Sequence, residues 1–160
     1  MNFYIDIQHA CSDKIPVTDR QLSDWVTKAL SAYRECGELT LRLVNQEEIK
    51  RLNAQYRKKN SPTNVLAFPV HYPFEIALEL PLLGDIIVCP EVLAEESVRL
   101  TKALDAHWAH IVIHGALHLL GYDHITEDEA QVMQTIEITL LQQLGFANPY
   151  DETEEDDKIA

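Results

Sequence analysis

The sequence predicts an α+β fold in which about four strands form one sheet that is packed with about five helices. Two observations lead to this fold class. Short apolar or alternating segments are separated by helical patterns in the first 90 residues, and long helical patterns dominate the C-terminal half. The 160-residue chain is long enough to bury one hydrophobic core. We therefore expect a single domain over residues 1–150.

The N-terminal part alternates between strands and helices. Residues 3–7 alternate apolar with polar side chains, which is typical of a strand. A helix follows, whose N-cap is Thr18 or Asp19 and whose apolar residues keep the 3.6-residue period up to Tyr33. Residues 39–44 then predict a second strand.

A second helix is predicted after Asn45. Glu48 follows this asparagine at the spacing of an N-cap pair, and the apolar period extends to Tyr56. A polar loop over residues 57–63 leads to a third strand, which the apolar run over residues 64–70 predicts.

The fourth strand is predicted over residues 84–89. This segment is short and apolar enough to lie in the centre of the sheet. The stretch before it, from Pro73 to Pro81, is expected to be a surface connection. Pro90 suits the first turn of the helix that follows.

The C-terminal half is predicted to be helical. Asp105 is the expected N-cap of a helix that is apolar almost all round, so we expect this helix to be buried. Gly121 can adopt the left-handed backbone that ends it. A last helix is predicted to start at the capping box formed by Thr126 and Glu129 and to end at Gly145.

Three histidines surround the predicted end of the buried helix. His114 and His118 are four residues apart, so a helix places them on one face, and the turn at Gly121 can return His124 as a third ligand. Imidazoles buried among aliphatic side chains are costly unless each finds a partner, and one metal ion serves all three. Three ligands leave a position for water, as in catalytic zinc sites. We predict a divalent metal at this helix end; core histidines are the alternative.

The other four histidines lack this arrangement. His110 also lies four residues before His114, which offers an alternative pair, but no helix stop follows it. We expect these four to be ordinary side chains: His9, His71, His107 and His110.

The spacing of the three histidines matches the zinc ligands of metzincin peptidases. In those enzymes a glutamate follows the first histidine and acts as the general base, whereas this chain has Gly115. The peptidase hypothesis is therefore disfavoured. A metal can still lower the pKa of a bound water to roughly 7. A substrate with its own anionic oxygens, such as a phosphodiester, suits that chemistry.

The charge of the chain is unevenly distributed. The net charge is −13 and the pI is about 4.8, which argues against general affinity for nucleic acid. Six acids lie in residues 151–157, and we expect residues 151–160 to form an acidic, disordered tail. A small basic group favours a limited, guided contact with RNA; it comprises Lys50, Arg51, Arg57, Lys58 and Lys59.

Other features restrict the location of the protein. No apolar run reaches the ~18 residues of a membrane span, and the N-terminus lacks a secretion signal pattern. The three cysteines are widely spaced and odd in number, which argues against a disulfide framework. We expect a cytoplasmic protein.

Three segments together resemble the YbeY family of bacterial endoribonucleases. Residues 114–124 match its H-G-x-L-H-L-x-G-Y-D-H signature throughout, residues 52–69 resemble its second motif, and residues 83–86 resemble its third. The likeness extends roughly from residue 40 to residue 150. Ala67 departs from the pattern, because the family usually has serine there.

The resemblance implies a zinc-dependent, single-strand-specific endoribonuclease. It also implies an α+β fold with a four-stranded mixed sheet surrounded by helices. It implies a role in 16S rRNA 3′-end maturation and in ribosome quality control, with the ribosome or ribosomal proteins as partners. It also implies that His114, His118 and His124 bind the metal and that Arg57 is catalytic or positions RNA. Independently, a guanidinium can bind a phosphate bidentately and stabilise transition-state charge.

Several alternatives remain at this stage. The chain could be a metallo-hydrolase of peptides or amides, or a non-catalytic ribosome-assembly factor with a structural metal. Three imidazoles also suit nickel or copper, and the oligomeric state is open. Lys58 and Lys59 are expected to hold backbone phosphate. Asp85 and Asp123 could orient ligand imidazoles or serve as structural caps.

Overall fold

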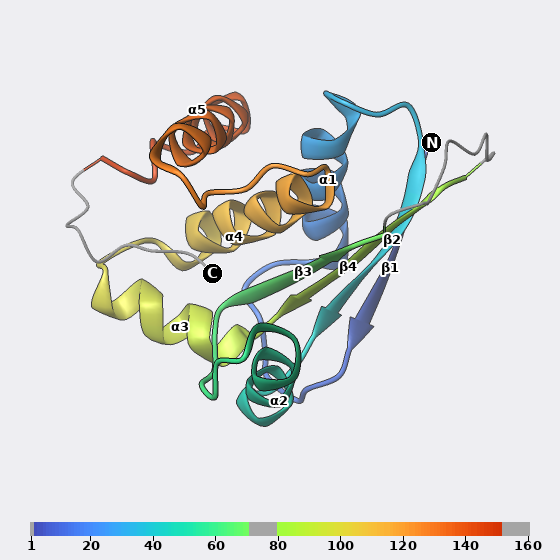
Figure 1. The fold of residues 1–160 in the computed structure, drawn as a ribbon. Helices are drawn as coiled ribbons and strands as arrows, with labels where there is room; N and C mark the ends of the chain where they lie inside the picture. The colour runs from blue at the N-terminus through green and yellow to red at the C-terminus, as the bar shows by residue number, and fades with distance from the viewer. Residues whose placement is uncertain (1, 71–79, 152–160) are drawn as a thin grey trace.

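The computed structural model describes residues 2–70 and 80–151. Within these ranges the chain forms four strands and five helices, which confirms the α+β fold with a mixed sheet (Figure 1). The elements in chain order are β1 (Phe3–His9), α1 (Asp19–Ser31), β2 (Gly37–Leu43), α2 (Gln46–Arg57), β3 (Val65–Pro69), β4 (Leu82–Val88), α3 (Pro90–Arg99), α4 (Leu104–Leu119) and α5 (Glu127–Gln143).

The sheet has the strand order β1-β2-β4-β3. β2 pairs in parallel with both β1 and β4, whereas β3 runs antiparallel to β4 and forms one edge. Ile86 is paired with Leu41 on one side and Ala67 on the other, so β4 is central, as predicted. Residues of β2 alternate between buried and partly buried positions, as its sequence pattern indicates.

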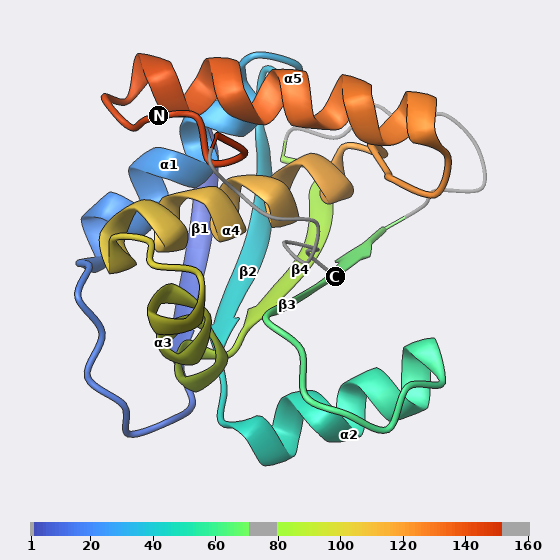
Figure 2. The same cartoon turned by 90° about the vertical axis from the view of Figure 1, so that its left-hand side faces the viewer.

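The helices bury both faces of the sheet unequally. α1 and α4 pack together over one face, and α4 lies between the sheet and α5 (Figures 1 and 2). This side holds the main core. A smaller cluster forms where Ile49 of α2 packs with Leu66 and Ile87. The asymmetry makes α4 the centre of the molecule.

Helix α4 is the most deeply enclosed helix of the described chain. Every residue from His107 to Leu117 is buried, which confirms the prediction of a buried histidine helix. A helix that is apolar all round can pack on several sides at once, and α4 contacts α1, α3, α5, β3 and β4. Its histidines are consequently carried into the interior.

Most of the predicted helix starts are confirmed by side-chain hydrogen bonds. Thr18 caps α1 and Thr126 caps α5, each within a capping box, and Asn45 caps α2. α1 ends at Ser31, earlier than the apolar period through Tyr33 suggests, because Ala32 already forms the C-cap.

The predicted cap of α4 is wrong. Ala103, with an extended backbone, is the N-cap and offers no side-chain hydrogen bond. Asp105 lies in the first turn, where its Oδ1 accepts a hydrogen bond from the Ala106 amide at 2.8 Å. Thr101, which has φ = 55°, lies in the turn between the end of α3 and this start. The Asp105 carboxylate still lies favourably near the positive end of the helix dipole.

Three predictions concern residues outside the described ranges. They are the ordinary role of His71, most of the connection from Pro73 to Pro81, and the acidic tail after Asp151. In residues 2–70 and 80–151, no helix is long and apolar enough to cross a membrane.

Candidate metal centre

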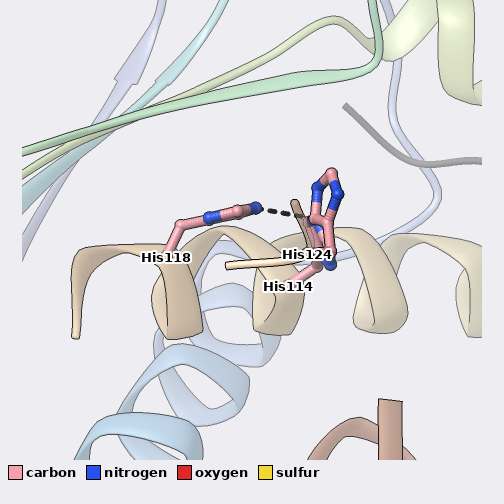
Figure 3. Close-up of side chains that lie close together, drawn as sticks. All are labelled: His114, His118 and His124. Carbon is pink, nitrogen blue, oxygen red and sulfur yellow. Dashed lines mark hydrogen bonds between the residues drawn. The ribbon is translucent and has the colours of Figure 1, made fainter. Parts of the chain in front are cut away.

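Three imidazoles converge at the C-terminal end of α4. His114 and His118 project from the helix, and His124 approaches from the turn that follows it (Figure 3). The Nε2 atoms of His114 and His118 are 3.0 Å apart. One ring nitrogen from each of the three residues lies within 4.8 Å of the others. The structure therefore brings the predicted ligand set together.

The local sequence builds this arrangement through a helix stop. Gly121 has φ = +101°, the left-handed conformation that was predicted for it. Its amide donates to the His118 carbonyl at 3.0 Å, and the Tyr122 amide donates to the Leu117 carbonyl at 3.1 Å. These bonds satisfy the last carbonyls of the helix. The chain reverses here, which brings His124 back to the helix.

The residues fit a divalent metal. Among the described side chains, His124 Nε2 is a buried nitrogen with no hydrogen-bond partner. Tetrahedral zinc, with Zn–N distances of about 2.0–2.1 Å, places its nitrogen ligands roughly 3.4 Å apart. The 3.0 Å separation between His114 and His118 is close to that spacing. An orphaned ring nitrogen beside two facing ones is the donor set that a metal would use.

The protonation state of His118 also suits metal binding. Burial, together with the neighbouring imidazoles of His114 and His124, lowers the pKa of His118 to about 4. The side chain is consequently neutral at pH 7, which is the form in which histidine binds metals.

Glu137 is a site residue that the sequence analysis missed. It lies on α5 and is completely buried. Its Oε2 is 2.5 Å from His114 Nδ1, and its Oε1 is 3.0 Å from His110 Nε2. The Tyr150 hydroxyl donates to the same Oε1. Burial would raise the pKa of Glu137, but the hydrogen bonds from His110 and His114 outweigh burial and lower it.

A signal for Glu137 was present in the sequence. This glutamate occupies the apolar stripe of the last helix, next to Ile136 and between Met133 and Leu140. Acids are rarely buried without a partner. An acid on an apolar stripe therefore predicts a buried partner, although it does not say which one.

The remaining described histidines bind carboxylates. His107 Nε2 is 2.9 Å from Glu96 Oε1 in the interior, and His9 pairs with Asp19 at the surface. His110 is more than the ordinary side chain we expected, because it shares Glu137 with His114.

Gly115 faces the sheet and lacks room for a side chain. A Cβ atom at this position would lie 2.8 Å from Ile86 Cγ2 and 3.3 Å from Val65 Cγ2. On this backbone a glutamate would collide with β4. Steric packing therefore explains why the acid of metzincin peptidases is absent here.

A cleft of about 380 Å³ lies beside the histidine cluster. His118 and His124 line it together with Arg57 from the end of α2 and Ala67 from β3. A second cleft, of about 420 Å³, is also lined by Arg57 and His124 and includes Lys59. Arg57 and His124 therefore border both clefts.

Lys58, Asp85 and Asp123 are the other polar residues that the sequence analysis considered for the site. Lys58 is the C-cap of α2, with φ = 61°, and lies outside both linings. Asp85 is exposed on β4. Asp123 Oδ1 accepts a hydrogen bond from the His124 amide at 2.8 Å, which is a backbone contact. The carboxylate that contacts a ring nitrogen of His114 is that of Glu137.

Comparisons with known proteins find relatives that match almost the whole chain. The family model described as Endoribonuclease YbeY matches residues 7–145. The chain is 52% identical over 151 residues to Endoribonuclease YbeY of Legionella pneumophila strains Corby, Lens and Paris, covering 94% of this chain and 96% of each relative.

A solved structure shares the fold. The solution structure of TM1509 from Thermotoga maritima has a TM-score of 0.56 at 24% identity, covering 95% of this chain and 99% of the other. The family match spans most of the chain, and the close relatives match it almost end to end. The chain therefore belongs to the Endoribonuclease YbeY family.

Proposed function

We propose that this protein is a zinc-dependent endoribonuclease that hydrolyses phosphodiester bonds in single-stranded RNA. The observation that carries the proposal is the convergence of His114, His118 and His124 beside a cleft that Arg57 also lines. Membership of an endoribonuclease family supports the reaction. The all-imidazole donor set is compatible with zinc.

In this proposal the side chains of the site have separate roles. The three histidines hold the metal, which when bound acts as a Lewis acid and lowers the pKa of a coordinated water. Arg57 binds the scissile phosphate through its guanidinium fork and stabilises the additional negative charge of the transition state. Lys59 lines the adjoining cleft and holds a neighbouring phosphate.

Charge and shape favour a restricted contact with RNA. A chain with a net charge of −13 repels polyanions over most of its surface. The basic side chains on and after α2 are exposed, and two of them line the clefts; the set is Lys50, Arg51, Arg57, Lys58 and Lys59. RNA is therefore guided to the clefts.

The cellular role that we propose follows the family. The substrate is ribosomal RNA, matured at the 3′ end of 16S rRNA, and the protein contributes to ribosome quality control together with the ribosome or ribosomal proteins. Residues 1–150 form the hydrolase domain, followed by an acidic tail over residues 151–160. The odd number and wide spacing of the three cysteines in the sequence support a cytoplasmic location.

The test combines metal analysis with RNA cleavage. Purified protein should contain one zinc ion per chain and cleave single-stranded RNA faster than duplex RNA. Chelation should abolish cleavage, and added zinc should restore it better than nickel or copper. Cleavage that survives complete metal removal would contradict the proposal. Full metal content without any cleavage would favour a non-catalytic assembly factor.

Arg57→Glu separates phosphate binding from metal binding. We expect it to lower the cleavage rate by about 100-fold, in the range found for the loss of one transition-state donor, because the carboxylate repels the phosphate. Bound zinc should be unchanged. Arg99→Glu is the control for the change in charge, since Arg99 is exposed, lies outside the basic group around α2 and lines neither cleft. Equal cleavage by the two variants would remove Arg57 from the mechanism.

A further inference from the structure

Glu137 connects the metal centre to two distant parts of the chain. Its carboxylate accepts hydrogen bonds from His114 and His110 on α4 and from Tyr150, which follows α5. The side chain is completely buried. A buried carboxylate is costly unless several donors surround it, and here three donors do so. Such an arrangement indicates a specific task for Glu137.

The hydrogen bond to His114 selects one tautomer of this ligand. An ionised carboxylate only accepts hydrogen bonds, so His114 Nδ1 must carry the proton. In the neutral ring, Nε2 then carries the lone pair. Nε2 is also the atom that lies 3.0 Å from His118 Nε2. Glu137 consequently directs the lone pair of His114 into the cluster.

His110 and Tyr150 hold Glu137 in position. Both interact with Oε1, which leaves Oε2 to His114. The rings of His110 and Tyr150 also meet edge to face, with centroids 5.2 Å apart. Tyr150 is supported by a segment whose Phe146 packs against Trp25 of α1 at 5.9 Å. The carboxylate is therefore fixed from two sides.

We propose that Glu137 is the positioning residue of the metal centre and that His110 and Tyr150 maintain its orientation. The inference rests on the proposed metal site and extends it to residues that do not contact the metal. Carboxylates that orient ligand histidines typically change metal affinity by about 10–100-fold when they are removed.

Helix α4 offers a matched control. Glu96 also accepts a hydrogen bond from a buried histidine of α4, His107, at 2.9 Å. Asn64 donates to the same carboxylate. Neither partner is a predicted metal ligand, so Glu96→Gln perturbs a similar histidine–carboxylate pair. Because Glu96 lines the cleft of about 420 Å³ with His124, the comparison uses zinc affinity and not cleavage.

The experiment measures zinc affinity by competition with a chromophoric chelator. We expect Glu137→Gln to bind zinc about 10–100-fold more weakly than the wild type. The carboxamide of the introduced glutamine has only one acceptor oxygen. Its amino group must therefore face one of the two imidazoles, His110 or His114, which loses its acceptor. Glu96→Gln should retain wild-type affinity. Tyr150→Phe, which leaves the carboxylate in place, should show a smaller loss of affinity.

Two spectroscopic measurements distinguish positioning from general stability. The absorption spectrum of the cobalt-substituted protein should change in Glu137→Gln and stay the same in Glu96→Gln. Nitrogen NMR of the metal-free wild type should show His114 with its proton on Nδ1, and Glu137→Gln should show a tautomer mixture. A purely structural role would lower thermal stability in both Gln variants without these differences.

The outcomes separate this inference from the proposed function. Wild-type protein that binds no divalent metal would overturn both. Wild-type protein that binds zinc, together with a Glu137→Gln variant of equal affinity and an identical cobalt spectrum, would overturn only the role of Glu137. If Glu137→Gln does not fold, Tyr150→Phe decides: an unchanged affinity and an unchanged cobalt spectrum in that variant contradict the proposal.

Discussion

The two ends of helix α4 use histidine in different ways. Near the N-terminal end, His107 and His110 each face a carboxylate, Glu96 or Glu137. At the C-terminal end, the Nε2 atoms of His114 and His118 face each other. Each carboxylate satisfies one ring nitrogen of its histidine, although Nδ1 of His107 and of His110 is buried without a hydrogen-bond partner among the described residues. Two facing ring nitrogens need a proton or a metal between them. The chemistry of the partner, more than the spacing, therefore distinguishes a ligand from a structural histidine.

His114 belongs to both groups. Its Nδ1 contacts a carboxylate, as in the N-terminal pair, and its Nε2 faces another imidazole, as in the C-terminal pair. Spacing alone could not reveal this, because His110 and His118 are both four residues from His114. The comparison gives three predictions, starting with the largest effect.

His118→Ala should abolish the metal centre. It removes one of three ligands, so we expect at least a ~100-fold loss of zinc affinity and of RNA cleavage. The side chain is only partly buried, so the fold should survive. Zinc titration followed by circular dichroism checks both expectations. Retention of tight zinc binding would show that the facing nitrogens are not ligands.

His107→Ala should lower the stability of the protein without changing its affinity for zinc. Zinc affinity should stay at the wild-type level, while the free energy of unfolding should fall by about 2–3 kcal/mol, because Glu96 loses a buried hydrogen-bond donor. Urea denaturation of the metal-free protein measures this change. A large loss of zinc affinity in a folded His107→Ala variant would erase the distinction between the two ends of the helix.

The third prediction is a pH dependence of the metal-free protein. The pKa of His118 is lowered to about 4 in the folded state, by burial and by His114 and His124, against an ordinary value of 6.5. As the pH falls, His118 therefore takes up a proton in the unfolded chain before it does so in the folded chain. Stability from this group is complete above pH 6.5 and is lost as the pH falls toward 4.

Denaturation midpoints between pH 7.5 and 4.5 test this dependence. The metal-free wild type should lose stability more steeply than His118→Asn, which lacks the titrating ring. Parallel pH profiles for the two proteins would show that His118 takes up its proton equally readily in the folded and unfolded states.

Local patterns in the sequence predicted most of the fold. Apolar periods and capping boxes depend on residues within a turn or two of each other, so the starts of α1, α2 and α5 were predicted correctly. The start of α4 was not, because Asp105 is a favourable cap but Ala103 has the extended backbone. There the path of the chain overrides residue preference.

The site was predictable only where it is local. His114, His118 and His124 lie within one helix end and one turn, so their convergence follows from the helical repeat and Gly121. Glu137 lies on another helix, and its contact with His114 depends on how α5 packs on α4. The clefts beside Arg57 likewise depend on where the end of α2 lies relative to the turn. No local pattern contains that information.

The turn at Gly121 bears on how the proposed metal would reach its site. Two of the proposed ligands belong to the enclosed helix α4, whereas His124 lies on a partly exposed turn. An added Cβ at Gly121 would meet no atom within 4 Å. We expect assembly in two separable stages: the core folds first, and the ion is loaded afterwards by movement of one hinged ligand.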